Sequence, residues 1–235
     1  MQLNIRHKSR GFWASGVKGT GKSTLIETFL LNHPCDHLIV YDHQGEYSDR
    51  LRAFSCYTFE DCELAWKARK AILFNPCKLY PGFKSPDGTI SSEKRTPKDI
   101  AWGRAEGFHD YSKHVWRWIN EDPFRIKLFC WDESGSAVPV HAGYNSHPAR
   151  LIVEEGRTRG CDLLWATQQT NQANNQLRNQ ATDVFAFRHE DETACDWLIR
   201  KGFPLNELQT LPDGHYIYKS SRDASLVRSE IQLGV

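Results

Sequence analysis

The sequence predicts an α/β fold with a mostly parallel central sheet flanked by helices, and two observations lead to that prediction. Short apolar runs rich in β-branched and aromatic residues alternate along the chain with segments of helical periodicity, as in β-α-β units. Two of the runs, His37–Tyr41 and 126–131, are apolar at nearly every position. Such runs are typical of parallel strands that are covered on both faces.

The first expected strand is at 11–15, and a helix follows at 22–32, where apolar residues recur at helical spacing until Pro34 ends it. The segment 134–146 contains Gly, Pro and Asn and is expected to be a loop. The remaining expected elements are strands at 37–41, 71–74, 126–131, 161–167 and 184–187, helices at 99–120, 148–155 and 191–201, and a hairpin of 215–218 and 225–231.

The composition is that of an ordinary globular protein, because 40% of the 235 residues are hydrophobic and 25% are charged. A single domain is expected over residues 1–235. Within it, the stretch 78–98 is expected to be a surface excursion, and 212–235 to hold the C-terminal hairpin. No apolar run approaches the roughly 18 residues that span a bilayer, and the N-terminus lacks the apolar core of a secretory signal. We therefore expect no stable membrane insertion.

Charge and cysteine content narrow the classes of function. Lys and Arg number 30 against 29 Asp and Glu, so the formal net charge is +1. This excludes a strongly basic DNA-binding protein but leaves open contact with nucleic acid through a local patch. The seven cysteines have no C-x-x-C spacing and the histidines no H-E-x-x-H, which argues against a zinc site or a disulfide framework. A reducing, cytoplasmic compartment fits this pattern.

Residues 16–23, G-V-K-G-T-G-K-S, fit the phosphate-binding pattern G-x-x-x-x-G-K-[ST] at each defined position. The context also fits, because a predicted strand leads in and a predicted helix begins at Lys22. Glycines let the backbone wrap a phosphate, and the helix N-terminus adds a partial positive charge. Lys22 is expected to reach the β- and γ-phosphates of ATP, and Ser23 to hold Mg²⁺. The expected nucleotide-binding residues are Gly16, Val17, Lys18, Gly19, Thr20, Gly21, Lys22, Ser23 and Thr24.

Two acidic residues, Asp132 and Glu133, follow the predicted strand at 126–131. A hydrolytic P-loop enzyme needs one acid for the Mg²⁺ shell and one to activate the attacking water. Both acids must lie at the carboxyl edge of the sheet, beside the phosphate loop. We therefore expect Asp132 to bind Mg²⁺ and Glu133 to act as the general base.

Three further segments resemble the HerA/FtsK superfamily of ring-forming, DNA-translocating ATPases. Residues 42–47 match its D-x-x-G-E-Y stretch, 154–160 resemble its E-G-R-x-x-G segment, and 163–168 resemble its strand ending in A-T-Q. The resemblance implies a RecA-like P-loop NTPase domain. One departure is Gln169, where many relatives have an arginine followed by proline.

The resemblance also assigns roles to single positions. Gln168 would sense the γ-phosphate and couple hydrolysis to movement. Arg157 would be the arginine finger that reaches the nucleotide of the neighbouring subunit and stabilises charge on the transferring phosphoryl group. Arg159 and Arg188 are alternative arginines for this role in trans. Asp42 would either act directly or only shape the loop beside the nucleotide.

Among members of the superfamily, the chain resembles most the small genome-packaging ATPases of tailless, membrane-containing icosahedral viruses and phages. We expect it to lack the N-terminal barrel, membrane anchor and winged-helix tail of larger members. The expected function is an ATP- and Mg²⁺-dependent homo-oligomeric ring, a hexamer, that moves double-stranded DNA of any sequence into a preformed capsid. A capsid or membrane vertex complex is a further expected partner, and the expected location is the host cytoplasm or the virion vertex.

Other interpretations stay open. The same motifs fit another DNA-transfer ATPase, of plasmid mobilisation or filamentous-phage-type assembly, and a nucleotide-dependent interaction or assembly module. A small-molecule kinase shares the P-loop, but Glu133, Arg157 and Gln168 in this order argue against it. For DNA contacts, the basic stretch 78–98 and the loop 141–150 are candidates, because a ring motor grips the phosphate backbone with lysine and arginine.

Overall fold

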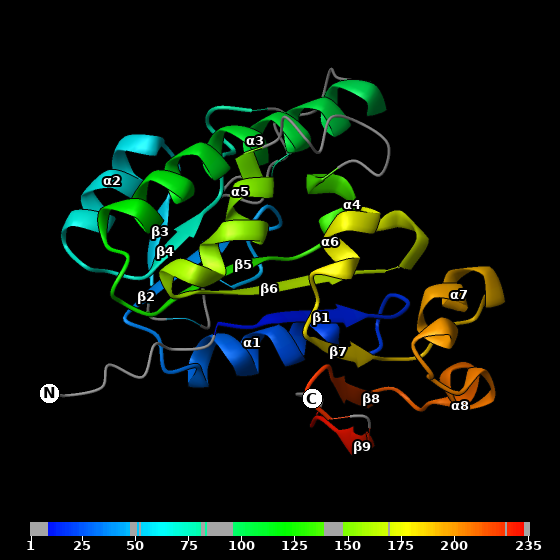
Figure 1. Cartoon of the computed structure of the whole chain (residues 1–235). Helices are drawn as coiled ribbons and strands as arrows, with labels where there is room; N and C mark the ends of the chain where they lie inside the picture. The colour runs from blue at the N-terminus through cyan, green and yellow to red at the C-terminus, as the bar shows by residue number, and fades with distance from the viewer. Residues whose placement is uncertain are drawn as a thin grey trace, which may run out of the picture. The chain divides into compact units, whose positions relative to one another are not determined.

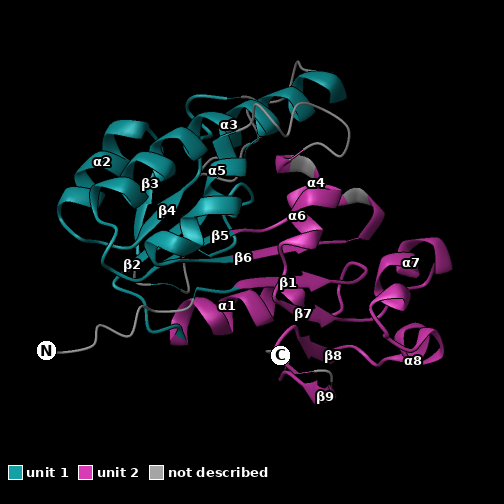
Figure 2. Ribbon diagram, in the orientation of Figure 1, with its two compact units in different colours: residues 1–10, 33–130, 144–163 teal, residues 11–32, 131–143, 164–235 magenta. Residues whose placement is uncertain are grey.

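The computed structural model describes residues 9–47, 51, 53–80, 83, 96–138, 148–168, 170–223 and 225–232 (Figure 1). The chain forms two compact units (Figure 2). Unit 1 comprises residues 1–10, 33–130 and 144–163, and unit 2 comprises 11–32, 131–143 and 164–235. The single domain expected over residues 1–235 stays a prediction.

In the described part of the chain, nine strands form one sheet in the order β3-β4-β2-β5-β6-β1-β7-β8-β9. The strands are β1 (Gly11–Ser15), β2 (His37–Tyr41), β3 (Phe54–Cys56), β4 (Ile72–Phe74), β5 (Lys127–Trp131), β6 (Cys161–Thr167), β7 (Asp183–Ala186), β8 (His215–Ser220) and β9 (Leu226–Glu230). The helices are α1 (Lys22–Asn32), α2 (Phe59–Lys67), α3 (Pro97–Glu121), α4 (Ser134–Ala137), α5 (Pro148–Glu155), α6 (Asn175–Asn179), α7 (Glu192–Arg200) and α8 (Leu205–Thr210), with 3-10 turns η2 (Gly156–Arg159) and η3 (Thr170–Gln172). This mostly parallel sheet with flanking helices confirms the predicted fold class.

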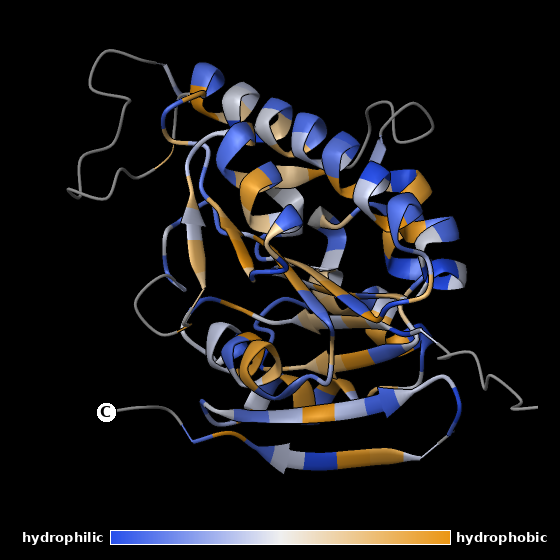
Figure 3. Ribbon diagram, turned by 90° about the vertical axis from the view of Figure 1, so that its left-hand side faces the viewer, coloured by the Kyte–Doolittle hydropathy of each residue, from blue (hydrophilic) through white to orange (hydrophobic). Residues whose placement is uncertain are grey.

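The strands carry the apolar sequence. Every residue of β1, β5, β6 and β7 is buried, as expected for strands covered on both faces. In β9, by contrast, four of the five residues are exposed. Figure 3 shows hydrophobic residues concentrated in the strands, whereas the helices alternate between hydrophilic and hydrophobic residues. Among the described helices, none is both long and apolar enough to cross a bilayer.

Unit 1 has an aromatic core between β2 and α3. The ring of Tyr41 lies 5.1 Å from that of Phe108 and 5.8 Å from that of Tyr111, measured between centroids. Helix α3 begins with a capping box, in which Thr96 and Asp99 each accept the other's backbone N–H. Helix α3 also packs against α5. These contacts fix one face of α3 on the sheet of unit 1.

Unit 2 joins a parallel strand pair to an antiparallel hairpin. β1 pairs in parallel with β7, with Ser15 opposite Ala186, and β8 and β9 continue the sheet antiparallel. Helix α1 is held on these strands by Phe29, whose ring lies 4.9 Å from that of Phe12 and 5.5 Å from that of Phe185. The carboxyl ends of β1 and β7 therefore meet at the start of α1.

Several elements follow the sequence closely. The bounds of β1, α1, β2, α5 and β6 agree with the predicted ones, and the other predicted elements differ by one or two residues. The sequence analysis missed β3, α2, α6 and α8, and it placed α4 in a loop. Residues 81, 82 and 84–95 of the expected surface excursion, and 141–147 of the candidate DNA-contacting loop, lie outside the described residues.

A buried ion pair joins His33 to Asp162 of β6 within unit 1. His33 Nε2 lies 2.9 Å from Asp162 Oδ2, and the two side chains are 8% and 1% exposed. Asp162 Oδ1 also accepts the backbone N–H of Arg10 at 2.6 Å. Burial lowers the pKa of His33, but the hydrogen bonds with Asp162 and Cys35 outweigh it and raise the pKa to about 9.

We expect this pair to make the free energy of unfolding depend on pH. The pKa of His33 is raised from 6.5 to about 9 on folding, so its stabilisation is complete below pH 6.5 and is lost as the pH rises through 9. The loss is about 3 kcal/mol. Urea unfolding of the wild type and His33→Gln measures it: the difference between the two proteins should shrink above pH 9. His215→Gln is the control because its side chain is 42% exposed. A difference that persists at high pH would contradict the prediction.

Candidate nucleotide-binding site

The phosphate loop connects β1 to α1 and is anchored to two neighbouring strands of unit 2. The N–H of Gly16 donates to Thr167 O at 3.3 Å, and the N–H of Val17 donates to Arg188 O at 2.9 Å. A Cβ at position 16 would lie 2.6 Å from the Cβ of Phe187, so the first glycine of the motif is required by close approach. The sequence motif thus folds at the carboxyl ends of β1, β6 and β7.

Lys22 is the first residue of α1, and its side chain turns back into the loop. Its Nζ donates to Val17 O at 2.8 Å, and the side chain is almost buried. Thr20 Oγ1 donates to the same carbonyl at 2.8 Å. Burial lowers the pKa of Lys22, while the negative charges of Asp132 and Glu133 oppose this shift. The ammonium therefore lies between the loop and the acidic pair, where it can meet a phosphate.

Ser23 and Asp132 bring oxygen donors together beside Lys22. Ser23 Oγ donates to Asp132 Oδ2 at 3.3 Å, although the two residues are far apart in the sequence. Asp132 Oδ1 accepts the backbone N–H of Glu133 at 2.8 Å, which orients the carboxylate. A hydroxyl and a carboxylate at this separation are the hard oxygen ligands that Mg²⁺ prefers. The residues present fit the metal ion that a P-loop NTPase fold implies.

Glu133 has an unusual backbone conformation at the end of β5. Its φ of 55° is left-handed, which is costly for a residue with a side chain and clusters at functional sites. Burial raises the pKa of Glu133, and the charge of Asp132 raises it further, whereas Lys22 and a hydrogen bond with Gln168 lower it. The net shift is upward. A carboxylate with a raised pKa is better suited to accept a proton near neutral pH.

The predicted site residues fall into two groups. The phosphate loop, Asp132, Glu133, Gln168 and Arg188 all belong to unit 2, while Arg157 and Arg159 lie on η2 of unit 1. Arg159 pairs with Glu155 at 3.4 Å and lies over the ring of Trp116 at 5.1 Å. Its guanidinium thus has partners within its own unit.

His189 belongs to the site, although the sequence analysis did not select it. The imidazole is fully buried, and its Nε2 lies 3.1 Å from Ser15 Oγ, one residue before the loop. Burial and the positive charge of Lys22 lower the pKa of His189 to about 4, so the ring is neutral at pH 7. The available signal was its place just after β7, since the carboxyl ends of parallel strands converge.

Asp42 organises the loop after β2 in unit 1. Its carboxylate accepts the backbone N–H groups of Glu46 at 3.0 Å and Tyr47 at 3.1 Å, and Gly45 takes a left-handed φ of 69°. Burial raises the pKa of Asp42 to about 6, although these hydrogen bonds oppose the shift. The D-x-x-G-E-Y stretch is therefore a hydrogen-bonded turn, and Asp42 shapes it.

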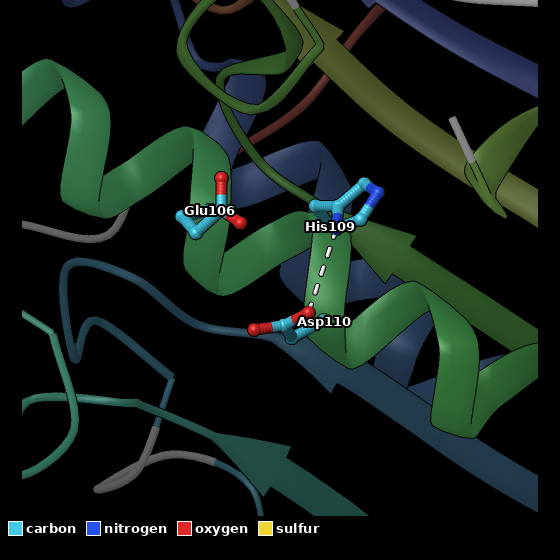
Figure 4. A group of neighbouring side chains, drawn as sticks. All are labelled: Glu106, His109 and Asp110. Atoms are coloured by element: carbon cyan, nitrogen blue, oxygen red, sulfur yellow. Dashed lines mark ion pairs between the residues drawn. The ribbon is translucent and has the colours of Figure 1, made fainter. Parts of the chain in front are cut away.

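A further cluster of polar side chains, Glu106, His109 and Asp110, lies on α3 of unit 1 (Figure 4). Potential ligand atoms of all three lie within 4.8 Å of one another. The carboxylate of Asp110 already accepts the Tyr80 hydroxyl at 2.5 Å and pairs with Lys113 at 2.7 Å. The cluster is partly exposed, and one of its two acidic members, Asp110, already has protein partners, so ion pairing on the helix surface explains the position of Asp110.

No protein-family model matches the sequence. No curated protein matches it by sequence either. Solved structures do match. The genome packaging NTPase B204 from Sulfolobus turreted icosahedral virus 2, in complex with AMPPCP, has a TM-score of 0.69 and 14% identity, over 97% of this chain and 100% of that one. B204 from Sulfolobus Turreted Icosahedral Virus, described as a DNA-packaging ATPase, has a TM-score of 0.64 and 16% identity, over 95% and 98%.

VirB4 of Thermoanaerobacter pseudethanolicus is a third similar structure, with a TM-score of 0.67 and 10% identity over 95% of this chain and 90% of that one. At such identities, likeness is evidence of a shared fold. The chain therefore has the fold of B204 and VirB4, which is the RecA-like P-loop NTPase fold that the sequence predicted.

Proposed function

We propose that the protein is an ATPase whose nucleotide binds at the loop of residues 16–24. The observation that carries this proposal is the convergence of Lys22, Ser23, Asp132 and Glu133 within unit 2. These residues come from two strand ends that only the fold brings together. The similarity to B204, which was solved with AMPPCP and with ATP-gammaS, supports the proposal.

Each side chain has a distinct task in the proposed reaction. Lys22 leaves the Val17 carbonyl and binds the β- and γ-phosphates. Glu133 accepts a proton from the water that attacks the γ-phosphorus, while the bond to the bridging oxygen breaks and ADP leaves with that electron pair. Gln168, hydrogen-bonded to Glu133, senses the γ-phosphate beside this base. Glu133 then returns the proton to solvent, which restores the enzyme.

Ser23 and Asp132 are the residues that would hold Mg²⁺. The ion, when bound, neutralises charge on the phosphate oxygens and lowers the barrier to phosphoryl transfer.

At a finer level, we propose a homo-oligomeric ring, a hexamer, that translocates double-stranded DNA into a capsid. Arg157, with Arg159 as the alternative, acts in trans on the neighbouring subunit's nucleotide. The basic stretch 78–98 and the loop 141–150 are the proposed DNA contacts. The capsid or membrane vertex, in the host cytoplasm or the virion, is the proposed place of work. The similarity to B204, a genome packaging NTPase, supports packaging.

ATP hydrolysis by the purified protein, with and without double-stranded DNA, tests this function. We expect a DNA-stimulated rate that rises more steeply than linearly with protein concentration, because the trans arginine requires assembly. The stimulation should fall as salt is raised, since sequence-independent contacts to phosphates release counterions. A slow rate indifferent to DNA at every concentration would instead favour the nucleotide-dependent interaction module.

A further inference from the structure

We propose that Arg188 binds the β- and γ-phosphates of the nucleotide held by its own chain, and that Asp213 holds its guanidinium until these phosphates displace it. This inference rests on the proposed nucleotide binding. It differs from the role in trans that the superfamily resemblance suggested for Arg188. Here Arg188 acts in cis, and Asp213 and phosphate compete for its guanidinium.

The backbone of Arg188 is part of the phosphate loop's scaffold. Its carbonyl accepts the N–H of Val17 at 2.9 Å, and Val17 is the residue whose own carbonyl holds the Lys22 ammonium. The backbone N–H of Val17 is thus bonded to Arg188, and its backbone carbonyl is bonded to Lys22. Lys22 serves the β- and γ-phosphates in this motif. The backbone of Arg188 is bonded to the same loop residue, so its side chain starts close to the same end of the nucleotide.

Asp213 is tied to the other end of the same loop. It lies in a turn in which His215 N–H donates to Pro212 O at 3.1 Å, and Gly214 takes a left-handed φ of 80°. The N–H of Gly214 donates to Thr20 O at 3.1 Å. Both partners of the ion pair are therefore fixed to the loop by backbone hydrogen bonds, one at residue 17 and one at residue 20.

The side chains of Arg188 and Asp213 form an ion pair in addition to these backbone hydrogen bonds. Arg188 Nη2 lies 3.1 Å from Asp213 Oδ1, with the two side chains 31% and 52% exposed. A solvated ion pair of this kind contributes little to stability, so it exchanges easily. Phosphate oxygens carry more charge than one carboxylate and accept two parallel N–H bonds from a guanidinium. A polyphosphate in the loop can therefore displace Asp213, whereas a ligand without the outer phosphates cannot.

Release of Asp213 also reaches the C-terminal hairpin. The carbonyl of Gly214 accepts the N–H of Ile231 at 2.8 Å, just after β9. His215, the next residue, pairs with Glu230 of β9 at 3.2 Å. A change in the turn at Asp213 is thus transmitted to the end of β9. The displacement of Asp213 by phosphate would therefore alter the C-terminal hairpin as well as the phosphate loop.

Calorimetric titration of AMPPCP and of AMP, in Mg²⁺ buffer, tests the proposal with the wild type and four variants. Arg188→Ala should weaken AMPPCP binding about tenfold, and AMP binding hardly at all. Asp213→Asn should strengthen AMPPCP binding about threefold, because the carboxylate no longer competes and the turn is kept. The double variant should match Arg188→Ala. Asp196→Asn, an exposed carboxylate on α7, is the matched control and should bind both ligands as the wild type does.

Two kinds of result would overturn the inference. If Asp213→Asn weakens AMPPCP as Arg188→Ala does, or if both variants weaken AMP equally, the pair only supports the turn. If the effect of Arg188→Ala disappears on dilution to a concentration at which the protein is monomeric, the arginine acts in trans. A wild type that binds AMPPCP while the variants do not differ overturns this inference alone. A wild type that binds no nucleotide overturns the proposed function and the inference together.

Discussion

We expect Lys22→Ala to lower the affinity for ATP at least about 100-fold, or about 3 kcal/mol. The physical reason is the position of the ammonium, which is buried, held by a single residue's carbonyl, and faced by two carboxylates. Without this ammonium, the negative charges of Asp132 and Glu133 repel a phosphate in the loop, and one fewer cation offsets that repulsion. Calorimetric titration of a non-hydrolysable ATP analogue measures the loss directly.

The unfolding temperature of Lys22→Ala is the control for this substitution. Burial already opposes the charged form of Lys22, so replacing it removes a poorly solvated ammonium and should not lower the unfolding temperature. Lys67→Ala, at the exposed end of α2, is the matched lysine variant and should bind as the wild type does. If Lys22→Ala still bound ATP within a few fold of the wild type, the nucleotide would have to lie elsewhere.

Glu133→Gln is the second large effect, and it separates turnover from binding. The amide has nearly the same shape but cannot accept a proton, so kcat should fall by at least about 10²-fold. Affinity for ATP should be unchanged or higher, because one carboxylate facing the phosphates is gone. Single-turnover hydrolysis together with analogue titration measures both quantities on one preparation.

The matched control for Glu133→Gln is Glu192→Gln, an exposed residue in the first turn of α7. It should leave both rate and affinity unchanged. Gln168→Asn, which shortens the partner of Glu133, should lower the rate less than Glu133→Gln does, since the base itself is kept. Wild-type hydrolysis by Glu133→Gln would falsify the assignment of the general base.

Much of the fold was predictable because local patterns and tertiary contacts agree. The helix α1 and the strands β1, β2 and β6 have apolar residues at the spacing that their burial requires. The missed elements are those in which the local signal is short or mixed. β3 has only three residues, and one of them is exposed, so no run of alternation marks it.

The missed helix α2 did carry a signal. Its N-cap Thr58 and Asp61 form a capping box, the pattern that precedes a helix. That pattern is only four residues long and occurs by chance in many loops. The prediction of a helix therefore depended on the apolar periodicity after it. Leu64 breaks that periodicity, because it is an apolar residue on the exposed side of the helix, where it is 64% exposed.

By itself, the sequence determined which residue types the candidate site contains. A glycine loop with Lys22 and Ser23, an acidic pair after an apolar strand, and Gln168 after another strand are local patterns. Each is set by residues next to one another in the chain. They predicted the fold class and a phosphate-binding loop, since a strand end and a helix start suffice to define such a loop.

Only the tertiary structure decided which distant residues meet there. The order of β6, β1 and β7 in the sheet puts Thr167 and Arg188 against the loop, and it buries His189 beside Ser15. The turn at Asp213 reaches Thr20 only because β8 returns antiparallel along β7. These contacts depend on strand order and register. Strand order and register arise from packing the whole sheet and leave no local pattern in the sequence.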